Sequence, residues 1–208
     1  MSSASQRPVG QPAGPDPTVE TSPRRPRLAT VWMGGCSGCH MSFLDLDERL
    51  FALAERADVV FSPLADVKTY PPDVDVVLVE GAVTNEDNLE LAHQLRANTR
   101  VVISFGDCAV TGNVTALRNA LGEPSELLQR VYVDQVDLLP VLPTDVVPAL
   151  LPRALPLHEV IPVDVYLPGC PPPADRIHRA VVAILTSLAA GEGVPDLGWR
   201  GPDDLRFG

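Results

Sequence analysis

The chain has 208 residues, of which 45% are hydrophobic and 21% are charged, and its formal net charge is −11. This length allows one domain with a sizeable core and is hardly enough for two. The acidic balance, with no face rich in Lys or Arg, excludes nucleic acid as an expected partner because phosphate binding needs a basic surface. No membrane span is expected either, because no apolar run reaches the ~20 residues that cross a bilayer.

The first stretch, residues 1–27, is rich in Pro, Ser, Gly and Gln and has almost no large apolar side chain. Such a segment buries too little surface to offset its ordering entropy, so we expect a flexible leader. Arg24 and Arg25 resemble the start of a twin-arginine export signal. However, the apolar residues that follow belong to the first predicted strand and leave no separate apolar region. A cytoplasmic location is therefore expected.

Strands and helices alternate through the rest of the chain. The apolar patterns predict strands at 27–33, 59–61, 74–79, 100–105 and 163–167, and helices at 41–56, 85–97, 113–121 and 174–190. This alternation predicts an α/β fold, a flavodoxin-like doubly wound parallel sheet of about five strands. The predicted domain spans residues 28–190 and is followed by a C-terminal tail, 191–208.

One stretch does not fit the alternation. From residue 123 to residue 162, prolines repeatedly interrupt a sequence rich in Leu and Val. A long irregular insertion inside a compact domain is often functional. Because residues 131–162 carry more apolar side chains than a free loop should expose, we expect this part to contact a partner.

The four cysteines stand where predicted strands end. Cys36 and Cys39 form a Cys-x-x-Cys pair in a Gly-rich turn after the first strand, while Cys108 follows the fourth strand and Cys170 the fifth. The carboxyl ends of parallel strands meet at one edge of a sheet, so the four thiols are expected to converge there. In a cytoplasmic chain, such cysteines favour metal binding or catalysis over disulfides. Four thiolates suit one 4Fe–4S cluster.

Two other uses of these cysteines remain open. A structural zinc site also takes four cysteines, but commonly as two close pairs, whereas the later spacings here are about 60 to 70 residues. A thioredoxin-like dithiol would use only Cys36 and Cys39 and would leave the other two unexplained. The residues favour an iron–sulfur cluster over both alternatives.

Four motifs, in this order, resemble the small subunits of nickel–iron hydrogenases. They are GCSGCHMS at 35–42, VEGAV at 79–83, GDCA at 106–109 and LPGCPP at 167–172. The continuation HMSFLD resembles most closely the small subunit of the cytoplasmic NAD-reducing, bidirectional hydrogenase. The related complex I cluster subunit is similar in the last motif, but it carries adjacent cysteines where this chain has Cys36-x-x-Cys39.

The resemblance implies a subunit that holds the proximal 4Fe–4S cluster on Cys36, Cys39, Cys108 and Cys170. Its implied partners are a large subunit with the nickel–iron centre and diaphorase subunits that bind FMN and NAD and receive the electrons of H2. The chain would be part of a hydrogen:NAD+ oxidoreductase and inactive alone. No cysteine follows Cys170, so one cluster is expected. A complex I-like quinone reductase subunit and a zinc-stabilised binding module remain the alternatives.

Other residues near the motifs have two interpretations each. Glu80, after the third strand, matches a family glutamate near the cluster; it either assists proton or cluster chemistry or caps the next helix. His40 either hydrogen-bonds a cluster sulfur or starts a helix, and Asp107 either orients its loop or is solvated. Trp32 and Trp199 are expected to pack or to lie at an interface. FMN is not expected in this chain, because the cysteine pair occupies the turn after the first strand.

Overall fold

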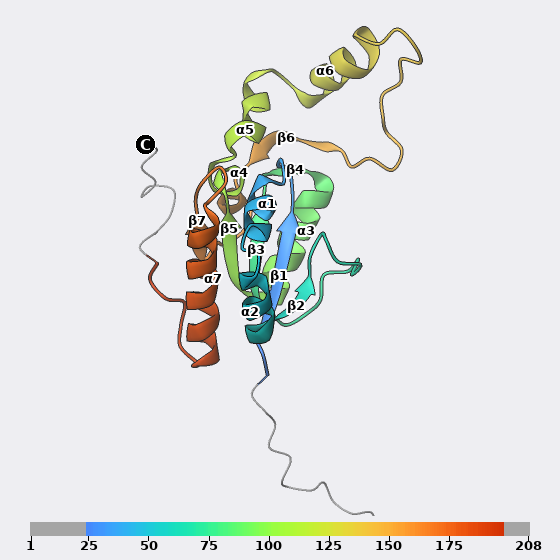
Figure 1. Ribbon diagram of the computed structural model, residues 1–208. Helices are drawn as coiled ribbons and strands as arrows, with labels where there is room; N and C mark the ends of the chain where they lie inside the picture. Colours follow the sequence, from blue (N-terminus) through green and yellow to red (C-terminus); the bar gives the residue numbers. More distant parts are fainter. Residues whose placement is uncertain (1–23, 198–208) are drawn as a thin grey trace, which may run out of the picture.

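Five parallel strands form the central sheet of the computed structural model, which describes residues 24–197. From one edge to the other they are β2 (Asp58–Phe61), β1 (Arg27–Trp32), β3 (Val74–Glu80), β5 (Thr99–Phe105) and β7 (Val165–Leu167). All four neighbouring pairs are parallel. This order, with the first two strands exchanged and the others in sequence, is that of flavodoxin-like sheets. The predicted fold class is confirmed (Figure 1).

Helices cover both faces of the sheet. The α-helices are α1 (Gly38–Leu44), α2 (Arg49–Arg56), α3 (Glu86–Asn98), α4 (Asp107–Thr111), α5 (Asn113–Ala116), α6 (Pro124–Gln129) and α7 (Ala174–Ala189). One core joins the sheet to α2 and α7 through residues such as Leu53 and Ile184, and a second joins it to α3 through Ala92 and Leu95. Because the sheet is buried on both faces, its strands are almost continuously apolar.

The helix predicted at 41–56 is two helices with a turn between them, so that prediction is corrected. The first helix begins at Gly38, three residues earlier than expected, and the second begins at Arg49. Asp47, in the turn, has a positive φ of 49°, which a continuous α-helix does not allow. Leu46 is only 1% exposed, so the turn brings this side chain into the core.

The helix predicted at 113–121 forms as α5 followed directly by a 3₁₀ turn, and a further short helix, α4, precedes it. The chain forms α4 first, then α5, and then a short 3₁₀ helix at Leu117–Ala120. Gly112 separates the first two helices with a left-handed φ of 83°. The sequence did not predict α4 because five residues are too few to show helical periodicity.

The insertion is not irregular throughout, which corrects the expectation for residues 123–162. It begins with α6 and a π-helical turn at Arg130–Asp134, and it ends with β6 (Leu150–Leu155) and a 3₁₀ turn at Leu157–Glu159. β6 pairs antiparallel with β4 (Val83–Asn85). Such pairing between distant segments leaves no local pattern in the sequence. Residues 123–149, which we call the arm, project from the body of the domain (Figure 1).

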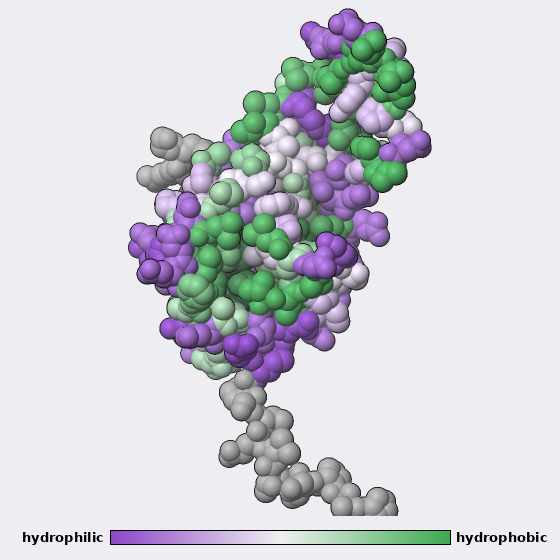
Figure 2. Space-filling view, turned by 45° about the vertical axis from the view of Figure 1, so that its right-hand side comes forward, coloured by the Kyte–Doolittle hydropathy of each residue, from purple (hydrophilic) through white to green (hydrophobic). Residues whose placement is uncertain are grey.

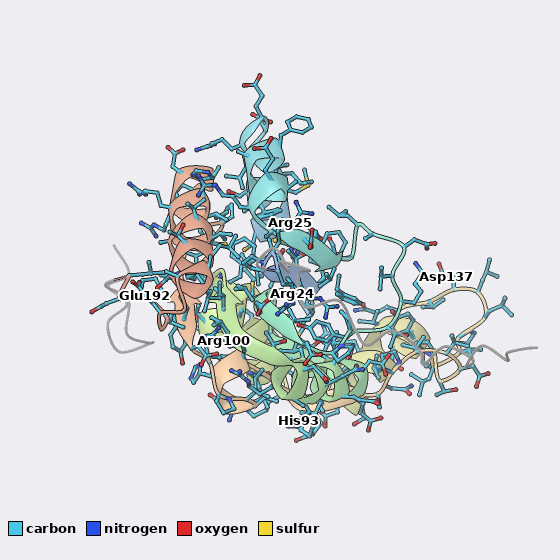
Figure 3. The ribbon with its side chains drawn as sticks, turned by 90° about the horizontal axis from the view of Figure 1, so that it is seen from below. Arg24, Arg25, His93, Arg100, Asp137 and Glu192 are labelled. Carbon is cyan, nitrogen blue, oxygen red and sulfur yellow. The ribbon has the colours of Figure 1, made fainter. Side chains whose placement is uncertain are left out.

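The described chain begins beneath the sheet, where Figure 3 shows Arg24 and Arg25. Arg24 forms an ion pair of 3.0 Å with Asp75, and Arg25 forms one with Asp58. The end of the predicted leader is therefore bound to the domain, while residues 1–23 lie outside the described part. Of the predicted tail, residues 191–197 are described and Trp199 is not. Within 24–197, no helix is long and apolar enough to cross a bilayer.

Candidate metal centre at the carboxyl edge

The structure places the four cysteines at the carboxyl edge of the sheet. Cys36 lies in the turn after β1, and Cys39 is the second residue of α1. Cys108 is the second residue of α4, directly after β5, and Cys170 follows β7. Because these strands are parallel, their following segments emerge on the same side, where α1 and α4 lie in Figure 1.

Cys39 is the buried member of this group. Its side chain is 7% exposed, whereas Cys108 is half-buried and Cys36 and Cys170 are exposed. Burial raises the pKa of the Cys39 thiol, and Glu80 and the other three cysteines each raise that pKa further. The influence of the other three thiols on Cys39 agrees with the placement of all four cysteines at the same edge of the sheet.

The four donors at this edge are all thiols, the ligand type that iron–sulfur clusters use. A structural zinc site needs four ligand atoms at ~2.3 Å or less from one point. A cubane of iron and sulfide is a larger body that spaces its four thiolates around it. The chemistry of the donor set therefore suits an iron–sulfur cluster, and the assignment of the ligands stays a prediction.

Gly106 leaves room for the Cys39 sulfur. Its φ is +81°, and a Cβ at this position would lie 2.1 Å from Cys39 Sγ. The same residue donates a backbone hydrogen bond of 2.8 Å to the carbonyl of Leu167, which joins the ends of β5 and β7. Glycine is thus needed here for both its backbone conformation and its missing side chain.

Asp107 joins the loop of Cys108 to the loop of Cys170. Its backbone N–H donates to the Gly169 carbonyl at 2.9 Å, and its carboxylate accepts from the Gly169 N–H at 2.7 Å. Two reciprocal hydrogen bonds fix the separation of these loops more firmly than one would. Of the two interpretations of Asp107, the structure supports the orienting one.

Glu80 caps the helix that carries Cys39. The carboxylate is buried, 2% exposed, and accepts backbone hydrogen bonds from Cys39 at 3.4 Å and from His40 at 2.9 Å. Ser37, at the N-cap of α1, makes no side-chain capping bond, so Glu80 replaces it. The capping interpretation holds, but the capped helix is α1 and not the helix after β3. Asn85 caps that helix, α3.

His40 is held by the same carboxylate. Its Nδ1 hydrogen-bonds Glu80, and its ring, 1% exposed, meets Trp32 edge to face with centroids 5.1 Å apart. Its Nε2 has no hydrogen-bond partner among the described residues. Trp32 is 38% exposed and therefore covers a buried ring with part of its surface while presenting the rest outward.

Three polar side chains near the cysteines were not predicted from the sequence. Asn113 donates to Cys170 Sγ at 3.4 Å, Thr115 donates to the Gly34 carbonyl at 3.2 Å, and Ser42 donates to the Pro172 carbonyl at 2.6 Å. Ser42 lies inside one of the four hydrogenase-like motifs, but the other two follow Cys108 by five and seven residues with no motif around them. Their partners come from distant strand ends, so only the fold reveals them.

Comparison with known proteins links this site to a family. A sequence model of the family described as NADH ubiquinone oxidoreductase, 20 Kd subunit, matches residues 36–184, a range that contains all four cysteines. An F420-non-reducing hydrogenase subunit of Methanothermobacter thermautotrophicus is 42% identical over 165 residues, which cover 77% of this chain and 53% of that protein. The chain therefore spans about half the length of this relative.

Two further proteins are similar over more of their length. The delta subunit of the NAD-reducing hydrogenase HoxS of Cupriavidus necator is 38% identical over 160 residues, 74% of this chain and 76% of that protein. A chain in the crystal structure of an NAD+-reducing NiFe-hydrogenase in the H2-reduced state is 38% identical, with a TM-score of 0.74. That match covers 89% of this chain and 100% of the crystallised one.

Proposed function

The chain belongs to the family of the NADH ubiquinone oxidoreductase 20 Kd subunit, and we propose that it is the electron-transfer small subunit of a nickel–iron hydrogenase. In this proposal, electrons from H2 oxidation in a large subunit cross one 4Fe–4S cluster of this chain toward flavin- and NAD-binding subunits. The observation that carries the proposal is the gathering of all four cysteines at one edge of the sheet. Relatives that are 38% and 42% identical and are named as hydrogenase subunits support it.

In this proposal, some residues of the site bind the cluster and others position the loops that carry the ligands. Cys36, Cys39, Cys108 and Cys170 would hold the cluster, which when bound supplies reversible one-electron transfer. Glu80 fixes the start of α1 through its two backbone hydrogen bonds, so it positions the ligand loop. Ligand loops that are fixed before the metal arrives lose less entropy on binding.

The exposed side of the site fits a covering subunit. Cys36 and Cys170 are exposed in this chain, and the neighbouring α1 presents Met41 and Leu44 with 59% and 36% of their surfaces open. A cluster that receives electrons must lie close to its donor, and a solvent-exposed cluster is open to oxidation. We therefore assign this edge to the contact with the large subunit that carries the nickel–iron centre.

The arm offers a second surface for that subunit. Nine of its large apolar side chains are exposed; they are Val131, Tyr132, Val136, Leu138, Leu139, Val141, Leu142, Val146 and Val147. Figure 2 shows apolar surface gathered on this projection. A hollow of about 600 Å³ lies between α6 and the returning chain, lined by residues such as Leu128, Tyr132 and Val147. A monomer rarely leaves so many apolar side chains in water without a partner.

Charge indicates what kind of surface meets the arm. The arm carries five acidic residues and a single basic one, Arg130. Asp137, one of the five, lies on the projecting part in Figure 3. A second copy of this chain would bring the same negative charge, so self-association through the arm is disfavoured. An apolar surface of the large subunit bordered by Lys and Arg is the complementary partner.

The remaining parts of the enzyme belong to other chains in this proposal. All four cysteines are used by one cluster, so no soft ligands remain for a nickel–iron centre. FMN and NAD are assigned to diaphorase subunits, and the chain alone is expected to lack hydrogenase activity. A cytoplasmic location for the assembly remains a prediction.

The alternatives have less support. A cluster subunit of a quinone reductase remains compatible with the family, but the Cys36-x-x-Cys39 spacing and the hydrogenase relatives favour the first proposal. A zinc-stabilised module would use the same four cysteines, but the spacings of about 60 to 70 residues beyond the first pair differ from the two close pairs common in zinc sites.

Co-expression with the neighbouring subunits of the native assembly tests the function. We expect the purified complex to reduce NAD+ with H2, and the isolated chain, once its cluster is assembled, to reduce no dye with H2. A complex in which H2 oxidation and NAD+ reduction stay coupled after Cys108→Ser would contradict electron transfer through this chain.

A further inference from the structure

Asn113 donates a side-chain hydrogen bond to a cysteine sulfur at the edge of the candidate centre. Its Nδ2 lies 3.4 Å from Sγ of Cys170, across a separation of 57 residues. From this contact we infer that Asn113 is a positioning residue that holds the Cys170 sulfur and raises the reduction potential of the bound cluster. The inference rests on the proposed function, because it requires the cluster to be bound through Cys170.

The backbone around Asn113 fixes this contact. Gly112 has a φ of +83° and Asn113 itself has a φ of +35°, a region that asparagine tolerates better than most residues. Two residues later, Thr115 donates to the Gly34 carbonyl at 3.2 Å. Gly34 belongs to the turn that carries Cys36, so α5 is attached to two of the three cysteine loops.

The 3₁₀ turn that follows α5, Leu117–Ala120, is also hydrogen-bonded to the rest of the domain. Arg118 donates to the carbonyls of Thr84 and Leu151, both at 3.0 Å. Asn119 exchanges two hydrogen bonds with the backbone of Ala154, at 2.8 Å and 2.9 Å. Because α5 and the 3₁₀ turn are held at both ends, Asn113 has little freedom to leave the sulfur.

The hydrogen bond from Asn113 should raise, and not lower, the reduction potential of the cluster. Reduction adds an electron, and part of the added negative charge spreads onto the thiolate sulfurs. An N–H donor that points at a sulfur stabilises the reduced form more than the oxidised form, so it raises the potential. Cys170 is an exposed cysteine, and the Asn113 contact is therefore a way to stabilise charge on a ligand that the core does not shield.

Two substitutions remove the donor without straining the backbone. Asn113→Gly deletes the side chain and suits the positive φ, while Asn113→Asp keeps the shape and replaces the N–H donor with a carboxylate oxygen. Asn98→Asp is the matched control, since it adds the same charge at the end of α3, where, within residues 24–197, Asn98 donates to the Gln94 carbonyl of its own helix.

The test is a redox titration of the full-length chain in complex with its large subunit, followed by electron paramagnetic resonance of the reduced cluster. At a fixed solution potential, we expect the fraction of reduced cluster to fall roughly threefold or more in Asn113→Gly, and further in Asn113→Asp. Asn98→Asp is expected to titrate as the wild type. An exchangeable proton coupling to the cluster should also disappear in both Asn113 variants.

The outcomes separate the two proposals. A wild-type complex without a cluster on this chain overturns the proposed function. A wild-type complex with the cluster, and an Asn113→Gly variant that keeps full iron content, an unchanged midpoint and the proton coupling, overturns the role of Asn113 alone. If Asn113→Asp loses the cluster, Asn113→Gly still decides the question, because it introduces no charge.

Discussion

The hydroxyl of Ser42 donates a hydrogen bond of 2.6 Å to the backbone carbonyl of Pro172, across 130 residues of sequence. Ser42 lies on α1, three residues after Cys39, and Pro172 lies two residues after Cys170. Both residues are buried, Ser42 with 6% of its surface exposed. This bond therefore fixes the first cysteine loop against the last one inside the protein, independently of any metal.

Removal of the Ser42 hydroxyl should weaken this link. Ser42→Ala leaves a buried carbonyl without a partner, which costs about 1–3 kcal/mol of stability. We expect a lower thermal unfolding midpoint and faster loss of iron to a chelator. Ser125→Ala, at an exposed position on α6, should change neither quantity. Equal iron loss from the two variants would show that the Ser42 bond does not hold the loop.

Replacing the buried Glu80 carboxylate should lower the free energy of unfolding more than replacing an exposed carboxylate would. Glu80→Ala leaves the N–H groups of Cys39 and His40 without their acceptor inside the protein, at a cost of roughly 2–4 kcal/mol. Glu80→Gln keeps one acceptor oxygen and should recover part of that loss. Denaturant unfolding of the full chain measures both. If Glu80→Ala is as stable as the wild type, the capping role is wrong.

Gly106 should not tolerate a side chain. In Gly106→Ala, the new Cβ would lie 2.1 Å from Cys39 Sγ, and alanine would also have to adopt a φ of +81°. We expect the variant to fold poorly or to bind no iron. Gly193→Ala is the control, because a Cβ there meets nothing within 4 Å. Full iron content in Gly106→Ala would mean that the turn relaxes without disturbing the site.

The arm should be protected only in the complex. It contains a single trypsin site, Arg130, so chymotrypsin or thermolysin, which cleave beside Leu and Tyr, are the suitable probes. Cleavage near Leu138 and Leu139 is expected to be fast in the isolated chain and slow in the complex. These side chains are 81% and 87% exposed in the isolated chain.

Substitutions in the arm test whether it contacts the large subunit directly or is only protected from proteases by it. Leu138→Asp with Leu139→Asp should weaken binding of the large subunit at least ~10-fold, since it places two charges in an apolar contact. Phe51→Asp, on α2 and 76% exposed, is expected to leave binding unchanged. Unchanged affinity of the Leu138/Leu139 variant would remove the arm from the interface and leave the cluster proposal untouched.

The sequence alone predicted the sheet because its strands are short, apolar and regularly spaced. It also predicted that the cysteines would meet, because the ends of parallel strands share one edge. It did not predict the turn at Asp47, since a left-handed residue interrupts an otherwise continuous helical pattern. The pairing of β4 with β6 was missed for a different reason: it joins segments about 65 residues apart, one of which contains Pro152.

The hydrogen bonds that position the cysteine loops were harder to predict from the sequence than the helices and strands were. The capping of α1 by Glu80 and the contact of Asn113 with Cys170 join residues 40 to 57 positions apart. Each residue alone has a common role elsewhere in proteins, as a surface carboxylate or a turn former. The family resemblance placed Glu80 near the cluster, but only the fold shows that Glu80 caps α1 and that Asn113 reaches Cys170.

One 4Fe–4S cluster on Cys36, Cys39, Cys108 and Cys170 is the prediction on which the proposed function depends. The most direct measurement is the iron, labile sulfide and zinc content of the anaerobically purified full-length chain, with electron paramagnetic resonance after reduction. We predict a brown protein with roughly four irons and four sulfides per chain, and loss of that signal in Cys108→Ser. A colourless protein with one zinc per chain would contradict the cluster.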